Sequence, residues 1–157
     1  MNRSPLNVGV ISDTHGLLRP EAAAALRGSD LIVHAGDVGD LSVLDRLREI
    51  APTFAVRGNV DTAPWARGLP AADVVEAGAL QLYVLHDVWA LDLDPKTAGF
   101  AAVISGHTHR PEADVRNGVL FLNPGSAGPR RFRLPVAVAR LRINGNHLSH
   151  EHIELGV

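Results

Sequence analysis

Short apolar segments recur along the 157-residue chain, and most of them end directly in Gly, Asp, His or Asn. Segments of this length, closed by turn residues, are typical of buried β-strands. Asn144-Gly145 lies between two alternating runs near the C-terminal end and predicts a β-hairpin. We expect strands over residues 8–11, 31–33, 54–56, 80–85, 101–104, 119–122, 136–143 and 147–155.

Two helices are expected between the first strands. One covers residues 20–27, with Pro20 in its first turn and Gly28 after its end, and the other covers residues 41–50, where leucines recur at helical spacing. Residues 60–70 hold two prolines and a glycine and are expected to form a loop. The order β-α-β-α followed by antiparallel strands favours a layered α/β fold. No linker or internal repeat interrupts it, so we expect a single domain over residues 1–157.

The composition excludes several classes of function. The chain has no cysteine, so disulfides, zinc–thiolate sites and cysteine nucleophiles are ruled out. Its net charge is -2, which gives no broad basic surface for nucleic acid or an anionic membrane. No apolar run approaches the roughly 20 residues of a membrane-spanning helix, and the first strand is too short for a signal peptide. We therefore expect a cytoplasmic protein.

Polar side chains cluster just after the apolar segments, where the ends of several strands of an α/β protein converge. Gly36, Gly58 and Gly106 each precede one of these side chains, and a bare backbone there permits a close approach. The candidate ligands are Asp13, His15, Asp37, Asn59, His86, His107 and His109.

Seven such ligands are too many for one tetrahedral ion and suit two ions that share a carboxylate, for which Asp37 is the natural candidate. The mixture of imidazole and oxygen donors favours Mn, Fe, Ni, Zn or Co over Mg or Ca, and we expect two divalent transition-metal ions, Mn first among them. A pair of such ions can activate a water and hold both oxygens of an in-line displacement at phosphorus. The pattern therefore predicts hydrolysis of phosphate esters.

The ordered motifs Asp13-x-His15, Gly36-Asp37, Gly58-Asn59-x-Asp61, His86 and Gly106-His107-Thr108-His109 resemble the signature of the calcineurin-like metallophosphoesterases. Asn123-Pro124-Gly125-Ser126 is similar to a further motif of the small single-domain bacterial and archaeal phosphodiesterases in that superfamily. The resemblance implies an α-β-β-α sandwich of two mixed sheets flanked by helices.

The same resemblance implies a role for each ligand. One metal would be held by Asp13, His15, Asp37 and His109, and the other by Asp37, Asn59, His86 and His107. We expect Asp37, Asn59 and His107 to act in catalysis as well as in metal binding.

Two positions depart from the family pattern. Many members have a histidine after the asparagine, where this chain has Val60, which cannot donate a proton to a leaving group. A glycine commonly follows the histidine at position 86, where this chain has Asp87. Asp87 is either a partner of an imidazole or a turn residue.

Several other residues have two readings. His34 and Asp61 are expected to support the ligands rather than to bind metal. His147, His150 and His152 are expected on a solvated strand face. Arg130, Arg131 and Arg133 either steer an anionic substrate or form a solvated loop. Trp65 and Trp89 either contact substrate or another copy of the chain, or pack in the core.

The leading functional hypothesis is a metal-dependent phosphodiesterase that acts on a small phosphodiester. One alternative is a non-catalytic metal-binding interaction scaffold of the same fold, which the retromer subunit with this fold resembles. The other is a nuclease, which the charge balance disfavours. Self-association is open, since no interface can be read from the sequence.

Overall fold

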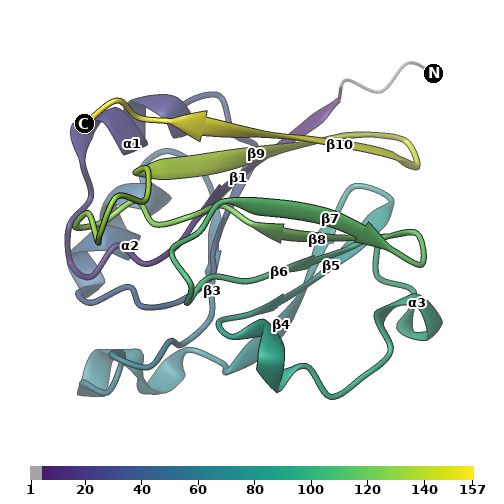
Figure 1. Ribbon diagram of the computed structural model, residues 1–157, viewed down its shortest axis with the longest axis horizontal. Coiled ribbons are helices and arrows are strands. Elements are labelled where there is room, and N and C mark those ends of the chain that lie inside the picture. The colour runs from purple at the N-terminus through teal and green to yellow at the C-terminus, as the bar shows by residue number, and fades with distance from the viewer. Residues whose placement is uncertain (1–4) are drawn as a thin grey trace.

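The computed structural model describes residues 5–157, which form ten strands, three α-helices and two short 3₁₀ helices (Figure 1). The helices are α1 (Pro20–Leu26), α2 (Leu41–Arg48), η1 (Pro64–Gly68), η2 (Val88–Ala90) and α3 (Pro95–Ala98). The strands are β1 (Leu6–Ile11), β2 (Leu31–His34), β3 (Thr53–Ala55), β4 (Ala72–Ala77), β5 (Leu80–Leu85), β6 (Ala102–Ile104), β7 (Glu112–Arg116), β8 (Val119–Asn123), β9 (Ala137–Asn144) and β10 (His147–Glu154).

The strands form two five-stranded mixed sheets; in Figure 1, β10, β9 and β1 of the first sheet lie above β7, β8 and β6 of the second. The first sheet has the order β10-β9-β1-β2-β3, in which β1, β2 and β3 are parallel. The second has the order β4-β5-β6-β8-β7, in which β5, β6 and β8 are parallel and the two outer strands antiparallel. The predicted α/β class with two mixed sheets is confirmed.

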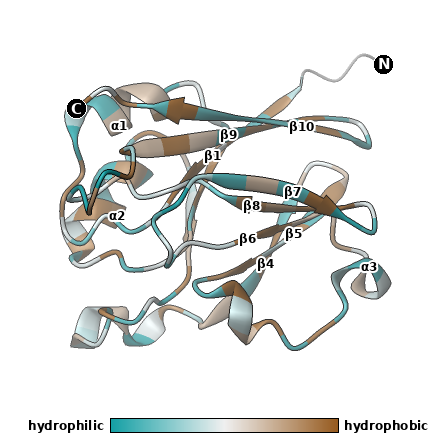
Figure 2. Cartoon of the chain, in the orientation of Figure 1, coloured by the Kyte–Doolittle hydropathy of each residue, from teal (hydrophilic) through white to brown (hydrophobic). Residues whose placement is uncertain are grey.

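Apolar side chains fill three layers. The largest cluster lies between the sheets and includes Val8 and Val10 from β1 with Leu82 and Ile104 from β5 and β6. Figure 2 shows the corresponding hydrophobic stretches along the strands. A second cluster joins the opposite face of the first sheet to α1 and α2, through Ile11, Ile32, Leu26, Leu44 and Leu47. A small third cluster, around Leu85, Val103 and Val119, lies on the outer face of the second sheet.

The structure differs from the predicted elements in several places. Residues 60–70 are not wholly a loop, because they contain η1, and the sequence reading omitted β4, β7 and the short helices η2 and α3. Asn144 pairs with His147 at the end of β9, so the hairpin turn is formed by residues 145 and 146, one position later than predicted. No helix among residues 5–157 is long and apolar enough to cross a membrane.

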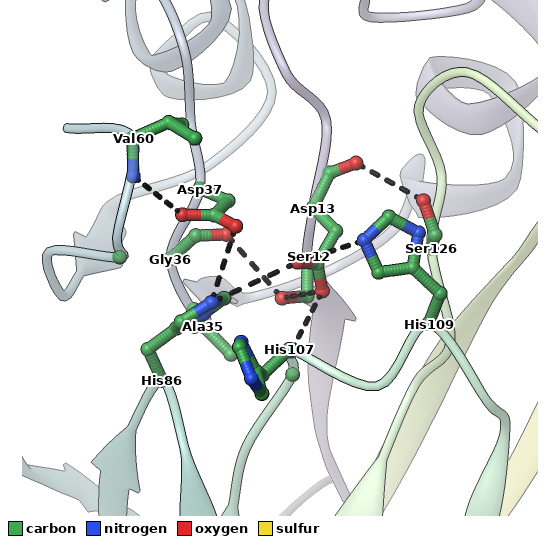
Figure 3. Close-up of polar contacts among 12 residues, drawn as sticks. Ser12, Asp13, Ala35, Gly36, Asp37, Val60, His86, His107, His109 and Ser126 are labelled. Atoms are coloured by element: carbon green, nitrogen blue, oxygen red, sulfur yellow. Dashed lines mark hydrogen bonds and ion pairs between the residues drawn. The ribbon is translucent and has the colours of Figure 1, made fainter. Parts of the chain in front are cut away.

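The direction of the parallel strands positions the polar motifs. Strands β1, β2 and β3 end at one edge of the first sheet, and β5, β6 and β8 end at one edge of the second. Parallel strands bring the residues after their carboxyl ends to a common edge. The two edges meet at the loops that carry the candidate ligands (Figure 3).

Candidate metal centre

The candidate ligands lie on loops with an unusual backbone conformation. Among residues 5–157, seven non-glycine residues have a positive φ, and five of them are candidate ligands, with φ between 47° and 73°. These five are Asp13, His15, Asp37, His107 and His109. A left-handed backbone costs free energy for such residues and persists where the surroundings enforce it, which is common at functional sites.

Backbone hydrogen bonds join the loop after β1 to the loop after β2. The N–H of Asp13 donates to the carbonyl of Gly36 at 3.0 Å, and the N–H of His15 donates to the carbonyl of Asp37 at 2.9 Å. The two ligand loops are therefore fixed against each other by main-chain contacts, before any side chain is considered.

Each of the two carboxylates is anchored by one oxygen and offers the other to the site (Figure 3). Oδ2 of Asp13 accepts hydrogen bonds from Ser12 Oγ at 2.8 Å and from the His107 N–H at 3.1 Å. Its Oδ1 is buried without a hydrogen-bond partner in the described chain and lies 3.4 Å from Nε2 of His109.

Asp37 is arranged in the same way. Its Oδ1 accepts a hydrogen bond from the N–H of Val60 at 3.0 Å. Its Oδ2 lies 3.2 Å from Nε2 of His86 and 3.6 Å from Nε2 of His15. Asp37 thus reaches an imidazole from each of the two ligand sets that the sequence analysis assigned to separate metals.

The histidines present ring nitrogens that lack hydrogen-bond partners. Nδ1 of His86 donates to the carbonyl of Ala35 at 2.8 Å, so Nε2 is the nitrogen that faces the carboxylates. In the described residues, Nε2 of His15, Nε2 of His86 and Nδ1 of His109 are buried and unpaired. Buried polar atoms normally have partners, and Nε2 of His15 and Nε2 of His86 both face the carboxylate of Asp37, which is an arrangement suited to binding a cation.

The convergence is close enough for metal binding. Ligand atoms of Asp13, His15 and His109 lie within 4.8 Å of one another, and so do those of Asp13, Asp37 and His86. The two groups overlap at the carboxylate of Asp13. Imidazole with carboxylate is a donor set suited to Mn, Fe, Ni, Zn or Co.

The charge states suit the same purpose. Burial opposes ionisation of Asp37, but His86 at hydrogen-bonding distance and the N–H of Val60 outweigh it and hold the pKa of Asp37 well below its usual range. Burial lowers the pKa of His15, against the attraction of Asp37 and Asp13. At neutral pH Asp37 is therefore an anion and His15 a neutral imidazole, the forms that bind metal.

Asn59 and His107 lie at the rim of this cluster. Both are exposed, and the ring of His107 packs edge-on against His86 with 5.2 Å between centroids. Asn59 shares the wall of a hollow with His86. The structure therefore brings five of the seven predicted residues into close contact and places the other two beside His86.

Two glycines make the close approach possible. A Cβ on Gly58 would overlap the backbone and carboxylate of Asp37, and a Cβ on Gly106 would overlap Ser12 Oγ and Asp13 Oδ2. Neither glycine has a positive φ, so their role is to leave space rather than to adopt a special conformation.

His34 holds the loop after β1 and the loop after β2 together through hydrogen bonds. It is fully buried, and its Nδ1 accepts the Gly36 N–H at 3.1 Å. Since Nδ1 is an acceptor, Nε2 carries the proton and donates to Thr14 Oγ1 at 3.0 Å, and that hydroxyl donates to the Val38 carbonyl at 2.8 Å. One neutral imidazole thus connects the loop after β1 to the loop after β2.

Asp61 fixes the third ligand loop. Its buried carboxylate accepts the N–H groups of Val38, Gly39 and Gly58 at 3.1, 3.0 and 2.9 Å. These contacts tie the loop that carries Asn59 to the loop that carries Asp37. Asp61 therefore supports the ligand loops through their backbone and is not a member of either group of converging ligand atoms.

The loop after β8 closes the site from the second sheet. Ser126 Oγ donates to the carbonyl of Asp13 at 3.0 Å, and the side-chain amide of Asn123 donates to the carbonyl of Gly106 at 2.9 Å. His152 Nε2 donates to the carbonyl of Asn123 at 2.7 Å. The expectation that His152 lies on a solvated face is wrong, because this contact from β10 half-buries it, whereas His147 and His150 are exposed.

The structure also shows the surroundings of the other residues that had two readings in the sequence. Asp87 is a turn residue, since its Oδ1 accepts the Trp89 N–H at 3.0 Å, while the hydrogen-bond partner of His86 is the carbonyl of Ala35.

Trp65 packs against the second apolar cluster, which joins the first sheet to α1 and α2, and Trp89 is 87% exposed. The three arginines at 130, 131 and 133 are exposed, and the charge of Arg131 helps to lower the pKa of His15, so its field reaches the site.

The sequence of the chain is similar to those of known proteins. Residues 6–146 match the sequence model of the calcineurin-like phosphoesterase superfamily domain. A probable metallophosphoesterase of Methanocaldococcus jannaschii is 39% identical over 132 residues, which cover 76% of this chain and 67% of that protein.

Two solved structures have the same fold at low sequence identity. One is an archaeal phosphodiesterase, with a TM-score of 0.77, 22% identity and coverage of 94% of this chain and 100% of that one. The other is Vacuolar Protein Sorting 29 of Cryptosporidium parvum, with a TM-score of 0.79, 20% identity and coverage of 97% and 100%.

Proposed function

The chain belongs to the calcineurin-like phosphoesterase superfamily, and we propose that it is a phosphodiesterase that hydrolyses a small phosphodiester with the help of two divalent transition-metal ions. The preferred metal is manganese, with Fe, Ni, Zn or Co as substitutes. Membership of the family supports phosphoester hydrolysis, and the donor set supports a transition metal.

One observation carries the proposal. The unpaired, buried atoms His15 Nε2 and His86 Nε2 lie 3.6 and 3.2 Å from Oδ2 of Asp37, and the unpaired Oδ1 of Asp13 lies 4.0 and 3.9 Å from the same two nitrogens. A folded chain gains nothing from leaving such atoms unpaired, because each one loses its hydrogen bonds to water. Cations bound between them would satisfy all of these atoms at once.

The residues divide the work of the reaction among them. Asp37, held ionised, would lie between the two cations, with His15 and His109 beside one and His86 beside the other. Cations in these positions would activate a water and neutralise charge on the phosphoryl oxygens. His107, which is exposed beside His86, would donate a hydrogen bond to one of those oxygens.

The leaving alcohol has no proton donor at position 60. Val60 contributes its N–H to Asp37 and has an aliphatic side chain. Esters of acidic alcohols therefore suit this site best, because such an alcohol can leave as its anion without being protonated first.

A diester rather than a monoester is favoured by the fold likeness to an archaeal phosphodiesterase. The charge of the substrate also argues for a diester, since a singly charged phosphate needs less positive charge around it than a dianionic monoester does. The charge of Arg131 is one of the causes that lower the pKa of His15.

The test is hydrolysis of bis(p-nitrophenyl) phosphate and of p-nitrophenyl phosphate by metal-stripped protein that is re-supplied with Mn, Ni, Zn or Mg. We expect turnover only with metal, highest with Mn, and a larger kcat/KM for the diester. A preference for the monoester would overturn the diester proposal while leaving the family unchanged.

A second candidate function is a non-catalytic metal-binding scaffold, which the likeness to Vacuolar Protein Sorting 29 favours. A scaffold has no need to keep all seven ligands, and this chain keeps them. Stoichiometric metal binding without turnover on either ester, with every metal, would support the scaffold.

A further inference from the structure

A hollow of about 320 Å³ opens beside the metal centre, and we call it the β5 hollow. Its wall at one end is formed by Asn59 and His86, two of the proposed metal ligands. From there it extends over the outer face of the second sheet, where Tyr83 and Leu85 of β5 lie. A substrate held at the metals therefore has this space next to one side of its phosphorus.

The walls of the β5 hollow combine three kinds of group. Arg57 supplies a cation, and Asp87 and Asp92 supply carboxylates. Arg57 and Asp92 are exposed, and one oxygen of Asp87 accepts the Trp89 N–H, which fixes the orientation of that carboxylate. The rest of the wall is small and apolar, since three alanines and Leu85 complete it.

Tyr83 gives the hollow a rigid aromatic wall. It is half-buried, and its ring rests against Phe100 with 5.0 Å between centroids and 31° between planes. An aromatic ring held in this way offers a flat apolar face and one polar hydroxyl to a ligand.

Resting on the phosphodiesterase function proposed above, we propose that the β5 hollow binds the second ester arm of the substrate, and that this arm is a neutral, hydroxyl-bearing ring such as a sugar or a nucleoside. Hydroxyls donate to the carboxylates, ring or carbonyl oxygens accept from Arg57, and an apolar ring face contacts Tyr83 and the alanines. The volume suits a single small-molecule group, because such pockets start at roughly 300 Å³.

Charge disfavours an anionic arm. The carboxylates of Asp87 and Asp92 outnumber the one cation, Arg57, so a second anionic arm would meet a wall of net negative charge. A wholly apolar arm would take water from these charged groups without replacing its hydrogen bonds. A polar neutral ring can form hydrogen bonds with the carboxylates and with Arg57 and can also contact the apolar part of the wall.

The test uses p-nitrophenyl diesters that differ only in the second arm, on the Mn-loaded protein. The arms are methyl, glucose linked through its 6-phosphate, and thymidine linked through its 5′-phosphate. We expect kcat/KM for at least one ring ester to exceed that for the methyl ester by about tenfold or more, mainly through KM. Comparison of the two ring esters tells a sugar from a nucleoside.

Variants that fill the hollow remove this preference. Ala71→Trp and Ala90→Trp place a large side chain at an exposed position of its wall, and Ala79→Trp does the same in the turn between β4 and β5, outside the hollow. We expect the ratio of ring-ester to methyl-ester kcat/KM to fall about tenfold in the first two and to stay unchanged in Ala79→Trp. Arg57→Ala should lower the ratio about fivefold.

Equal kcat/KM for methyl and ring arms in the wild type, or a ratio that survives both filling variants, would overturn the inference. Calorimetric binding of glucose 6-phosphate and thymidine 5′-phosphate separates it from the proposed function. If no ester is hydrolysed but one of these ligands binds, and Ala71→Trp weakens that binding about tenfold, the hollow is a ligand site and the phosphodiesterase proposal fails. Absence of both turnover and binding would overturn both.

Discussion

Nε2 of His86 lies 3.2 Å from Oδ2 of Asp37, while Nδ1 of the same ring donates to the carbonyl of Ala35 at 2.8 Å. The backbone contact decides which nitrogen faces the carboxylate, and the second oxygen of Asp37 is held by the N–H of Val60. The pair is thus set in position by main-chain groups of two different loops. Asn59 and His107 lie exposed beside His86.

Replacing Asp37 tests its position between the two ligand sets. Asp37→Asn keeps the shape of the side chain but removes the charge that faces His86 and His15, so we expect metal affinity and kcat/KM to fall at least about 100-fold. Calorimetric titration with Mn and a diester assay measure the two effects. Asp114→Asn is the matched control, because Asp114 is exposed and pairs with Arg116 on the surface; an equal loss in both variants would contradict the assignment.

The stability of the metal-free protein should depend on pH through His34. Burial lowers the pKa of His34 to about 4, from the 6.5 of a free histidine. Because the unfolded chain binds this proton more readily, the stabilising contribution is complete above about pH 6.5 and is lost as the pH falls toward 4. The shift corresponds to about 3 kcal/mol.

Urea unfolding in the presence of a chelator, between pH 4 and 8, measures this dependence. His34→Gln has no proton to gain in this range, so the difference in free energy of unfolding between wild type and variant should shrink as the pH falls. His86 has a raised pKa and contributes with the opposite sign in both proteins, so it cancels in the difference. A difference that is constant with pH would show that His34 is not the group responsible.

The space left by Gly106 can be tested with a single methyl group. Gly106→Ala would push a Cβ into Ser12 and Asp13, so we expect a loss of about 1–3 kcal/mol in stability and a clear loss of metal affinity. Gly68→Ala is the control, because no atom lies within 4 Å of a Cβ added at Gly68 and its φ is negative. Thermal unfolding with and without Mn measures both effects, and a harmless Gly106→Ala would contradict the close approach.

The valine at position 60 predicts a strong dependence on the leaving group. Since Val60 cannot protonate an alcohol, turnover should fall steeply from p-nitrophenyl to phenyl to alkyl esters. The side chain of Val60 is 47% exposed, so Val60→His has room for an imidazole and keeps the backbone N–H bond to Asp37. This variant should raise turnover of the poorer esters about tenfold or more. An unchanged dependence in the variant would mean that leaving-group protonation does not limit the rate.

Much of the site was predictable from local pattern alone. The ligands follow short apolar strands, and the strands are parallel, so the topology brings the polar ends together without any further signal. Glycines before Asp37, Asn59 and His107 marked the positions where backbones approach closely.

The strands that the sequence reading omitted lie at sheet edges. Strand β7 alternates polar and apolar residues, but its apolar residues are only Ala113 and Val115 and every residue of it is exposed, so no apolar run marks it. Strand β4 buries only Val75 and Ala77. Both are defined by their pairing with β8 and β5, which the local sequence does not record. The contact of His152 with Asn123 is of the same kind, since it joins residues from two different sheets.

The most direct test of the central claim is a titration of metal-stripped protein with Mn, in which diester turnover is measured after each addition. We predict no turnover without metal and a rise that is complete only at two equivalents per chain, because two ligand groups overlap at Asp13, and Oδ2 of Asp37 lies near His86 of one group and His15 of the other. Turnover in the absence of metal, or a rise that is complete at one equivalent, would contradict the two-metal account.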